Sequence, residues 1–345
     1  MIRAAVFRGV PGRLTLEAFA RPMLEEGEVL VRVMAATICG SDRHTVEGRR
    51  HVPMPTVLGH EIVGEVVESK RPDVAKGERV TWAIVANCGS CGPCGMELPQ
   101  KCVFGHKYGH EAFGDGASRS ILSGGFAEMI VLAAKTHVVR VPDHVPLAVA
   151  APANCATATV MAAVEGMGAG RSVLIAGCGL LGLTACAVMR SRGASRIVAV
   201  DPDAGRRSRA VEFGADEAHE PGDRAIPEEF DAALDFAGDS DVISWLLTRL
   251  RLAGRLVLVG RVAPGPSVSV DPERIVRRCL TIRGVHNYAP RHLDEAVDFL
   301  GGKGVRFPFE AAVGRWFALD EIETAFRLAA QPAHLRIGIR PSPDS

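Results

Sequence analysis

The chain has 345 residues, a length that predicts two domains, and its 47% apolar and 23% charged content is that of a folded rather than a disordered protein. Lysine plus arginine and aspartate plus glutamate number 40 each, so no excess charge favours nucleic acid or a membrane surface as the partner. The expected partners are therefore small molecules.

The first half of the chain is rich in short apolar runs of the β type, separated by glycine and proline. These expected strands cover residues 28–38, 56–68, 77–85 and 125–134. Together they predict a barrel-like β domain over residues 1–152. The longest apolar stretches of the chain are interrupted by glycines, so none predicts a membrane span.

Four cysteines lie between the third and fourth expected strands with the spacing C-x2-C-x2-C-x7-C. They are Cys88, Cys91, Cys94 and Cys102. One short loop with this spacing can surround a tetrahedral ion with four sulfurs, which predicts a structural zinc site with no open position for substrate. The alternatives are two disulfides or scattered core thiols. The chain opens without the pattern of a secretory leader, so we expect reduced thiols and a cytoplasmic protein.

A nucleic-acid-binding zinc module is a further alternative for the four cysteines. Such a module needs basic and aromatic surroundings, which this segment lacks. We therefore expect a structural role for this site and look for the chemistry elsewhere.

From residue 153 the pattern changes to alternating strands and amphipathic helices, which predicts a parallel α/β domain through residue 286. Its first strand runs into Gly177, Gly179 and Gly182, a G-x-G-x-x-G pattern that encloses Leu180 and Leu181. Glycines at these positions allow a tight turn, close approach of a pyrophosphate and close helix packing, while the helix N-terminus attracts phosphate. The pattern predicts a dinucleotide site.

Asp201 ends the next expected strand, about 20 residues downstream, where an acid can bind the ribose 2′-hydroxyl. An acid there repels a 2′-phosphate, so NAD is favoured over NADP. The alternative is that Asp201 only caps a helix. Arg206 and Arg207 could flank the ribose and keep NADP open. Arg336, on the expected closing strand of residues 336–341, could reach the phosphates.

Two further motifs lie in the β half of the chain, ICGSDRH at residues 38–44 and GHEIVGEV at residues 59–66. With the cysteine loop and the glycine pattern, the chain resembles the zinc-dependent medium-chain alcohol dehydrogenases through essentially its whole length. The resemblance implies a GroES-like catalytic domain of residues 1–152 and 287–345, and a doubly wound Rossmann domain of residues 153–286. It also implies a homodimer or homotetramer.

By this resemblance Cys39, His60 and Cys155 are the ligands of a second, catalytic zinc, and Glu61 occupies the adjacent acidic position, from which it can approach or transiently bind the metal. Two thiolates and an imidazole leave a fourth position for an alcohol oxygen or water. Zinc at such a site lowers the pKa of a bound alcohol and polarises a carbonyl, with hydride exchanged with NAD. The direction of the reaction stays open. Any one of these residues alone could be a packed thiol or a core histidine.

Ser41 and His44 match the family's proton relay, and Asp42 matches the position that supports the ligands. Ser41 could pass a proton through the cofactor ribose to His44, whose pKa range suits release to water. The alternative for His44 is an exposed turn residue. A zinc-free quinone reductase or a non-catalytic relative is the alternative for the whole chain, and the complete ligand set argues against it.

Arg43, Arg49 and Arg50 lie in a segment that also holds two histidines, which suggests an anion clamp or a solvated basic turn. The runs GRRHVPMPTVLGHE, LPQKC with KYGHE, and APANCATAT resemble a subgroup associated with phosphonate metabolism. That resemblance implies a phosphonate-bearing alcohol or a phosphonoacetaldehyde-like substrate, with Lys107 and His110 as further contributors. A polyol, an amino alcohol or a general secondary alcohol is the alternative. Residues 104–123 depart from the common family pattern and could shape the pocket mouth or an oligomer contact.

Overall fold

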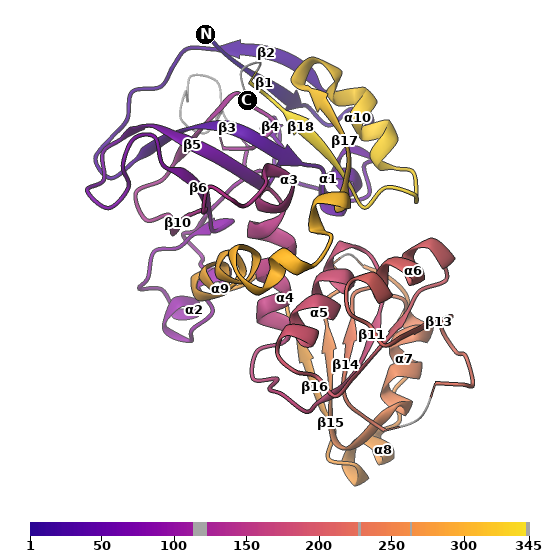
Figure 1. The fold of residues 1–345 in the computed structure, drawn as a ribbon. Coiled ribbons are helices and arrows are strands. Elements are labelled where there is room, and N and C mark those ends of the chain that lie inside the picture. The colour runs from indigo at the N-terminus through magenta and orange to yellow at the C-terminus, as the bar shows by residue number, and fades with distance from the viewer. Residues whose placement is uncertain (113–122, 227–228, 263, 343–345) are drawn as a thin grey trace. The chain divides into compact units, whose positions relative to one another are not determined.

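The computed structural model describes residues 1–112, 123–226, 229–262 and 264–342, and residues 113–122 of the 104–123 segment lie outside them (Figure 1). The chain divides into two compact units. Unit 1 comprises Met1–Ala158, Tyr288–Gly301 and Phe309–Ser345, and unit 2 comprises Thr159–Asn287 and Gly302–Pro308.

These borders differ from the expected ones by a single residue at Asn287 and by more in two other places. The first lies after Ala158, whereas the expected border at residue 153 would have placed Cys155 with the cofactor domain. Residues 302–308 group with unit 2 rather than with the returning C-terminal part.

Unit 1 is built mainly from antiparallel strands. In its described part, one sheet has the order β2-β1-β4, and a larger one has the order β10-β6-β5-β3-β18-β17, with β9 also paired to β3. The strands of the small sheet are β1 (Ile2–Phe7), β2 (Thr15–Phe19) and β4 (Thr56–Val57). Those of the larger sheet are β3 (Val29–Thr37), β5 (Glu61–Ser69), β6 (Arg79–Trp82), β9 (Met129–Leu132), β10 (Val138–Arg140), β17 (Val313–Ala318) and β18 (Arg336–Arg340).

Unit 1 also contains a pair of two-residue strands, β7 (Val85–Ala86) and β8 (His106–Lys107). Its α-helices include α1 (Gly40–Val46), α2 (Gly92–Gly95), α3 (Leu147–Ala150), α9 (Pro290–Gly301) and α10 (Ile322–Ala329). A π-helix of Ala153–Thr157 joins α3 to α4 (Ala158–Ala163).

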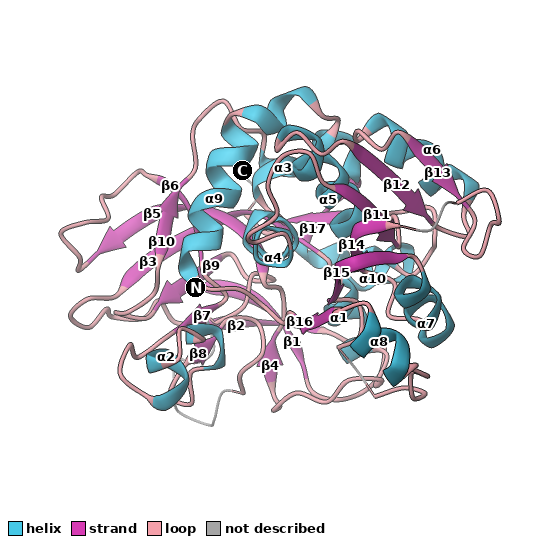
Figure 2. Cartoon of the chain, turned by 90° about the horizontal axis from the view of Figure 1, so that it is seen from below, coloured by secondary structure: helices cyan, strands magenta, loops and turns pink. Residues whose placement is uncertain are grey.

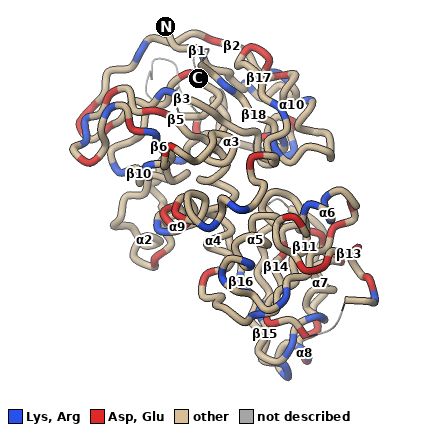
Figure 3. Tube along the Cα trace, in the orientation of Figure 1, with Lys and Arg blue, Asp and Glu red and all other residues tan. Residues whose placement is uncertain are grey.

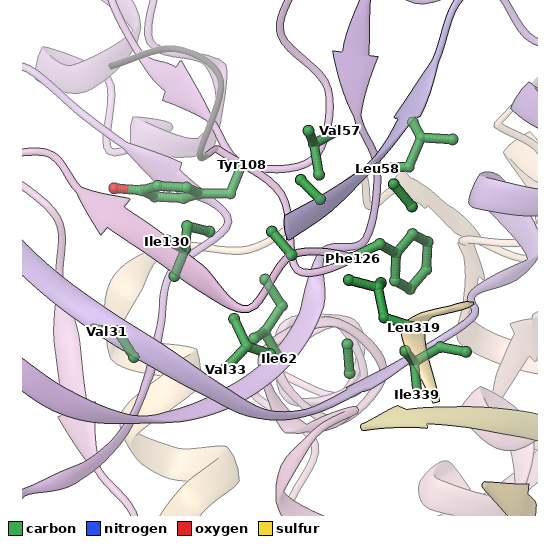
Figure 4. Packing of buried hydrophobic residues seen from close by; sticks show 14 of the residues in the cluster. Val31, Val33, Val57, Leu58, Ile62, Tyr108, Phe126, Ile130, Leu319 and Ile339 are labelled. Carbon is green, nitrogen blue, oxygen red and sulfur yellow. The ribbon is translucent and has the colours of Figure 1, made fainter. Parts of the chain in front are cut away.

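The core of unit 1 forms because the strands turn apolar side chains inward. Val33 of β3, Ile62 of β5 and Ile130 of β9 are fully buried, together with Phe126 (Figure 4). Burial of each such side chain contributes about 1.5–3 kcal/mol. The core thus gives β3 and β5 a rigid base, and the segments that follow β3 and precede β5 carry site residues.

Unit 2 is a parallel sheet with the order β13-β12-β11-β14-β15-β16 in its described part (Figure 2). Its strands are β11 (Ser172–Ala176), β12 (Arg196–Val200), β13 (Glu217–His219), β14 (Phe230–Asp235), β15 (Leu250–Leu258) and β16 (Thr281–Gly284). Its further helices are α5 (Leu180–Ser191), α6 (Ala204–Glu212), α7 (Ser240–Thr248) and α8 (Pro272–Arg277). Helix α5 packs on β11 and β12, and α7 packs on β14 and β15, as expected for alternating strands and helices.

Charged residues of both signs are interspersed along the chain in each unit (Figure 3). None of the helices in the described ranges is long and apolar enough to cross a membrane.

Candidate active site

Three metal-ligating side chains from separate segments meet in unit 1. Cys39 precedes the first turn of α1, His60 directly precedes β5, and Cys155 lies in the π-helix. One ligand atom of each lies within 4.8 Å of those of the other two. Two cysteine sulfurs and an imidazole nitrogen form a donor set typical of an open zinc site.

The three ligand side chains are coupled through their protons. The Cys155 thiol donates a hydrogen bond to the Cys39 sulfur, which lowers the pKa of Cys39 well below its ordinary value and raises that of Cys155. Burial lowers the pKa of His60, but the neighbouring carboxylate of Asp42 and the Cys39 sulfur outweigh burial and raise it to about 10. Without metal, the three ligands are thus a thiolate, a thiol and an imidazolium, and a metal ion that binds here replaces the protons of Cys155 and His60.

Asp42 orients the histidine ligand. Its carboxylate is buried, lies 3.1 Å from His60 Nδ1, and accepts a 3.0 Å hydrogen bond from the Cys39 N–H. A carboxylate behind a ligand imidazole fixes the ring and leaves the other nitrogen for the metal. That nitrogen, Nε2, lies 3.3 Å from the Ser41 hydroxyl, so Ser41 belongs to the same cluster.

Glu61 and Arg336 form a buried ion pair beside the cysteines. The guanidinium donates from Nε and Nη2 to the two carboxylate oxygens, each at 2.7 Å, and Nη2 lies 3.7 Å from the Cys39 sulfur. The Thr37 hydroxyl donates to the same carboxylate at 2.5 Å. Burial raises the pKa of Glu61, although Arg336 opposes that shift. Arg336, expected at the cofactor phosphates, thus engages Glu61 in this structure.

His44 lies one turn after Ser41 on α1. Burial, followed by the nearby Arg49, lowers its pKa below the ordinary value. Its Nδ1 is buried and makes no hydrogen bond with any described residue. The ring is therefore neutral near pH 7 and keeps one nitrogen available to accept a proton.

The four basic residues considered for an anion clamp separate into two pairs. Arg43 and Arg49 both form ion pairs with Glu47, and the Arg49 side chain is 56% exposed. Arg50 and Lys107 have no ion pair with an acidic side chain in the part of the chain that the structure describes.

Arg50 and Lys107 both lie next to His110, whose ring neighbours the ligand His60. Arg50 Nη1 is 2.9 Å from His110 Nε2, and the His110 ring centroid is 4.9 Å from that of His60. Burial and the charge of Arg50 lower the pKa of Lys107 to about 8. Burial and the surrounding cations also lower the pKa of His110, so this ring is neutral. Two cations therefore lie near the metal-ligating cluster.

The four closely spaced cysteines also meet. The sulfur of Cys91 lies 3.5 Å from that of Cys94 and 3.7 Å from that of Cys102. The Cys88 sulfur accepts hydrogen bonds from the N–H groups of Ser90 and Cys91, and these lower its pKa, the Ser90 bond most, to about 6. All nine cysteines are free thiols, so the structure contains neither of the alternative disulfides. Four converging sulfurs fit a closed zinc site.

In unit 2, the glycine pattern forms the turn between β11 and α5. Gly177 has φ +90°, and a Cβ on Gly182 would lie 1.8 Å from the Gly177 carbonyl oxygen, so neither position accepts a side chain. A Cβ on Gly179 would meet nothing within 4 Å. This residue caps α5, whose first two residues are Leu180 and Leu181. The open N-terminus of the helix fits the pyrophosphate of a dinucleotide.

Asp201 follows β12 beside this turn. Its carboxylate accepts hydrogen bonds from the N–H groups of Cys178 at 2.8 Å and Asp203 at 2.9 Å, which leaves a lone pair on each oxygen. In the first turn of α6, the Arg206 N–H donates to the capping side chain of Asp203, and the Arg207 side chain donates to the Asp201 carbonyl. The carboxylate is thus fixed and keeps capacity for a hydroxyl donor.

Sequence patterns did not reveal Thr37 or the buried amide of Asn154, which contacts β5 and β6. Neither residue stands in a spacing typical of a site, since both act through partners distant in the chain. The only available signal was the position of Asn154 directly before Cys155.

Comparisons with known proteins agree with this arrangement. Residues 25–143 match the alcohol dehydrogenase GroES-like domain, and residues 181–301 match the zinc-binding dehydrogenase family. A geraniol dehydrogenase from Castellaniella defragrans is 30% identical over 94% of this chain and 93% of its own length. An L-threonine 3-dehydrogenase from Streptomyces avermitilis is 34% identical over 80% of this chain and 81% of its own.

Among solved structures, an alcohol dehydrogenase from Thermotoga maritima has a TM-score of 0.92 at 26% identity, with 99% of both chains covered. This likeness and the domain matches confirm the expected fold of a GroES-like domain and a Rossmann-type parallel sheet.

Proposed function

Because this chain belongs to the zinc-dependent medium-chain alcohol dehydrogenase family and is thus an oxidoreductase, we propose that it exchanges hydride between NAD and an anionic alcohol or aldehyde. The observation that carries the proposal is the three-donor cluster of Cys39, His60 and Cys155 in one unit. Three protein donors leave a tetrahedral ion one position for substrate.

Two zinc ions per chain are proposed, with Cys39, His60 and Cys155 holding the catalytic ion and the four-cysteine loop holding the structural one. Bound zinc supplies a Lewis acid that acidifies an alcohol or polarises a carbonyl, and NAD supplies the hydride acceptor. Glu61 stays paired with Arg336 and so leaves the three-donor set open.

Side chains of this chain orient the ligand imidazole and transfer the substrate's proton. Asp42 holds the imidazole of His60, and Ser41 is placed to receive the substrate's proton beside the same ring. His44, neutral near pH 7 and one turn further along α1, is the proposed acceptor that passes the proton to water. In aldehyde reduction the same groups deliver the proton.

Asp201 supports NAD rather than NADP as the cofactor. Its two oxygens are fixed by backbone donors and retain acceptor capacity for the 2′-hydroxyl, whereas a 2′-phosphate would meet a carboxylate. Leu180, Leu181 and the three glycines would hold the pyrophosphate at the start of α5.

Arg50 and Lys107, which have no acidic partner among the described residues, support an anionic substrate, and a phosphonate-bearing alcohol or phosphonoacetaldehyde-like compound is our first candidate. An amino alcohol with a carboxylate is the second, because relatives at 28–34% identity are named L-threonine 3-dehydrogenase. Both candidates carry an anion near the reacting carbon, so the same two cations would bind either one.

The test is turnover with NAD on matched alcohols that carry a phosphonate, a carboxylate or a neutral group. The wild type is compared with Arg50→Gln and Lys107→Met, and with Arg49→Gln as a matched control. We expect KM for the anionic alcohols to rise at least tenfold in the first two variants only, as expected for loss of a charged hydrogen bond worth about 1.5–3 kcal/mol. Equal KM values in all variants would refute the anion clamp, and no turnover with any alcohol by the zinc-loaded wild type would refute the enzyme class.

We also propose a cytoplasmic location and a homodimer or homotetramer. The free thiols support a reducing compartment. The outer edge of β16 supports self-association, because this strand pairs only with β15 among the described residues and its Ile282 is 41% exposed.

A further inference from the structure

Cys155 stands apart from the other two ligands in how it is held. Cys39 and His60 lie next to the paired strands β3 and β5, whereas Cys155 lies in the π-helix of Ala153–Thr157 between two short helices. A π-turn inside a helical segment is uncommon and needs compensating contacts. The position of the Cys155 sulfur therefore depends on what fixes this turn.

The neighbouring Asn154 fixes the turn to the sheet. Strands β5 and β6 are paired at Gly64 with Val80, and continuing that register would place Ile62 opposite Trp82. There the Asn154 amide bridges the strands instead, because Oδ1 accepts from the Ile62 N–H at 3.2 Å and Nδ2 donates to the Trp82 carbonyl at 3.0 Å.

This bridge needs the chemistry of a short primary amide. Asn154 is 1% exposed, and its side chain takes the place of a peptide group in the ladder. Aspartate has no donor for the carbonyl when ionised, an aliphatic side chain has neither group, and glutamine is one carbon longer. Ile62 comes two residues after His60, so the same amide joins the segment of one ligand to that of another.

The main chain of Asn154 is held as well. The Tyr288 hydroxyl donates to the Asn154 carbonyl and lies 3.4 Å from the Ile84 N–H. Both Asn154 and Tyr288 are buried, so breaking these bonds would leave unsatisfied polar groups away from water. Contacts from three separate segments of unit 1 thus converge on the residue before Cys155.

We propose that Asn154 is a positioning residue whose amide sets the separation between the Cys155 sulfur and the His60 imidazole, and so sets how firmly the catalytic site retains zinc. The inference rests on the proposed zinc site. Groups that support metal ligands in this way typically change metal affinity by about 10- to 100-fold when replaced.

The experiment compares Asn154→Asp with wild type and with the control Thr81→Val. Thr81 is buried in the same strand pair and donates to the Ile62 carbonyl at 2.8 Å, but none of its described hydrogen bonds involves the π-helix. Zinc-loaded protein is mixed with a chromophoric chelator, and the release of catalytic and structural zinc is followed as two phases. The absorption spectrum of protein with cobalt in the catalytic site reports the ligand geometry directly.

We expect Asn154→Asp to speed release of catalytic zinc by about 10- to 100-fold and to alter the cobalt spectrum, with the structural phase unchanged. Thr81→Val should leave both phases and the spectrum as in wild type. Unchanged release and spectrum in Asn154→Asp, or an equal change in Thr81→Val, would overturn the inference.

If Asn154→Asp does not fold, Tyr288→Phe decides. The Tyr288→Phe variant should release catalytic zinc faster than the wild type and structural zinc at the same rate. Release of catalytic zinc at the wild-type rate would overturn the inference. Wild-type protein that binds no zinc at the three-donor cluster would instead refute the proposed function.

Discussion

Lys107 is a half-buried cation whose charge depends on pH in the neutral to alkaline range. Burial and the charge of Arg50 lower its pKa to about 8, so the ammonium is charged below that pH and neutral above it. If Lys107 binds the substrate's anion, KM for an anionic alcohol should be constant below pH 8 and rise by up to tenfold for each pH unit above it. We expect this profile from initial rates between about pH 6.5 and 9.5.

Lys107→Arg is the matched variant, because arginine keeps its charge throughout this range. The rise in KM should disappear in this variant, and a neutral alcohol should show no such rise in the wild type. An identical profile for both proteins, or for both substrates, would contradict the assignment.

Sequence motifs were informative wherever a residue's role depends on its neighbours in the chain. The motifs singled out Cys39, His60 and Cys155, and the structure brings their ligand atoms together. They gave no signal for the pairing of Glu61 with Arg336, since these residues are 275 positions apart. Position alone also could not separate Arg49, which pairs with Glu47, from Arg50, which lies against His110.

The four-cysteine loop lies between β7 and β8, and its role can be separated from the chemistry. We expect Cys91→Ser to lose the structural zinc and to lower the melting temperature by several degrees, because a closed metal site contributes directly to folding. The kcat per catalytic zinc should be retained at low temperature. Cys279→Ser, at an exposed free thiol, is the control and should match the wild type.

The measurements are zinc content, thermal denaturation and kcat normalised to catalytic zinc. An unchanged melting temperature together with full zinc content in Cys91→Ser would rule out a structural site at these cysteines.

The turn between β11 and α5 distinguishes glycines needed for folding from one needed for binding. A Cβ at Gly182 would collide with the Gly177 carbonyl, so Gly182→Ala should destabilise the fold by about 1–3 kcal/mol or more. A Cβ at Gly179 meets open space, so Gly179→Ala should change the free energy of unfolding by only about 0.5 kcal/mol. It should nevertheless weaken NADH binding about tenfold or more, because the added methyl occupies the place expected for the pyrophosphate.

Chemical denaturation and NADH fluorescence titration measure the two effects. Wild-type NADH affinity in a stably folded Gly179→Ala would show that the dinucleotide does not lie against this helix N-terminus.

For the secondary-structure elements, the sequence predicted the strands better than the turns that separate them. The expected strand at residues 56–68 is two strands in the structure, β4 and β5, separated at Leu58–His60. Gly59 adopts φ +93° there, and its conformation turns the chain just before His60. Apolar residues continue on both sides, so periodicity alone could not locate the turn. The π-helix was likewise not predicted, because the hydrogen-bond partners of its Asn154 side chain lie far away in the chain, in β5 and β6.

For the whole molecule, the alternation of strands and helices was enough to predict a β unit followed by a parallel α/β unit. The exact borders were not predictable, because they depend on contacts between distant segments. Cys155 groups with unit 1 through Asn154 and Tyr288, although the change of sequence pattern comes before it.

Strand β16 makes the association of whole chains testable. Parallel sheets are normally covered on both faces, yet in β16 only Arg283 is partly buried, and Ile282 is 41% exposed. An exposed apolar edge strand pairs readily with a second copy, whereas a lysine on such an edge opposes pairing. We therefore expect a wild-type dimer or tetramer in sedimentation velocity and a shift toward smaller species in Ile282→Lys. Val211→Lys, at a 49% exposed position on α6, is the control and should leave the association unchanged. Because β16 lies apart from the glycine turn in sequence, Ile282→Lys should still bind NADH.

A monomeric wild type, or an Ile282→Lys variant that sediments like the wild type, would exclude β16 as the contact between copies.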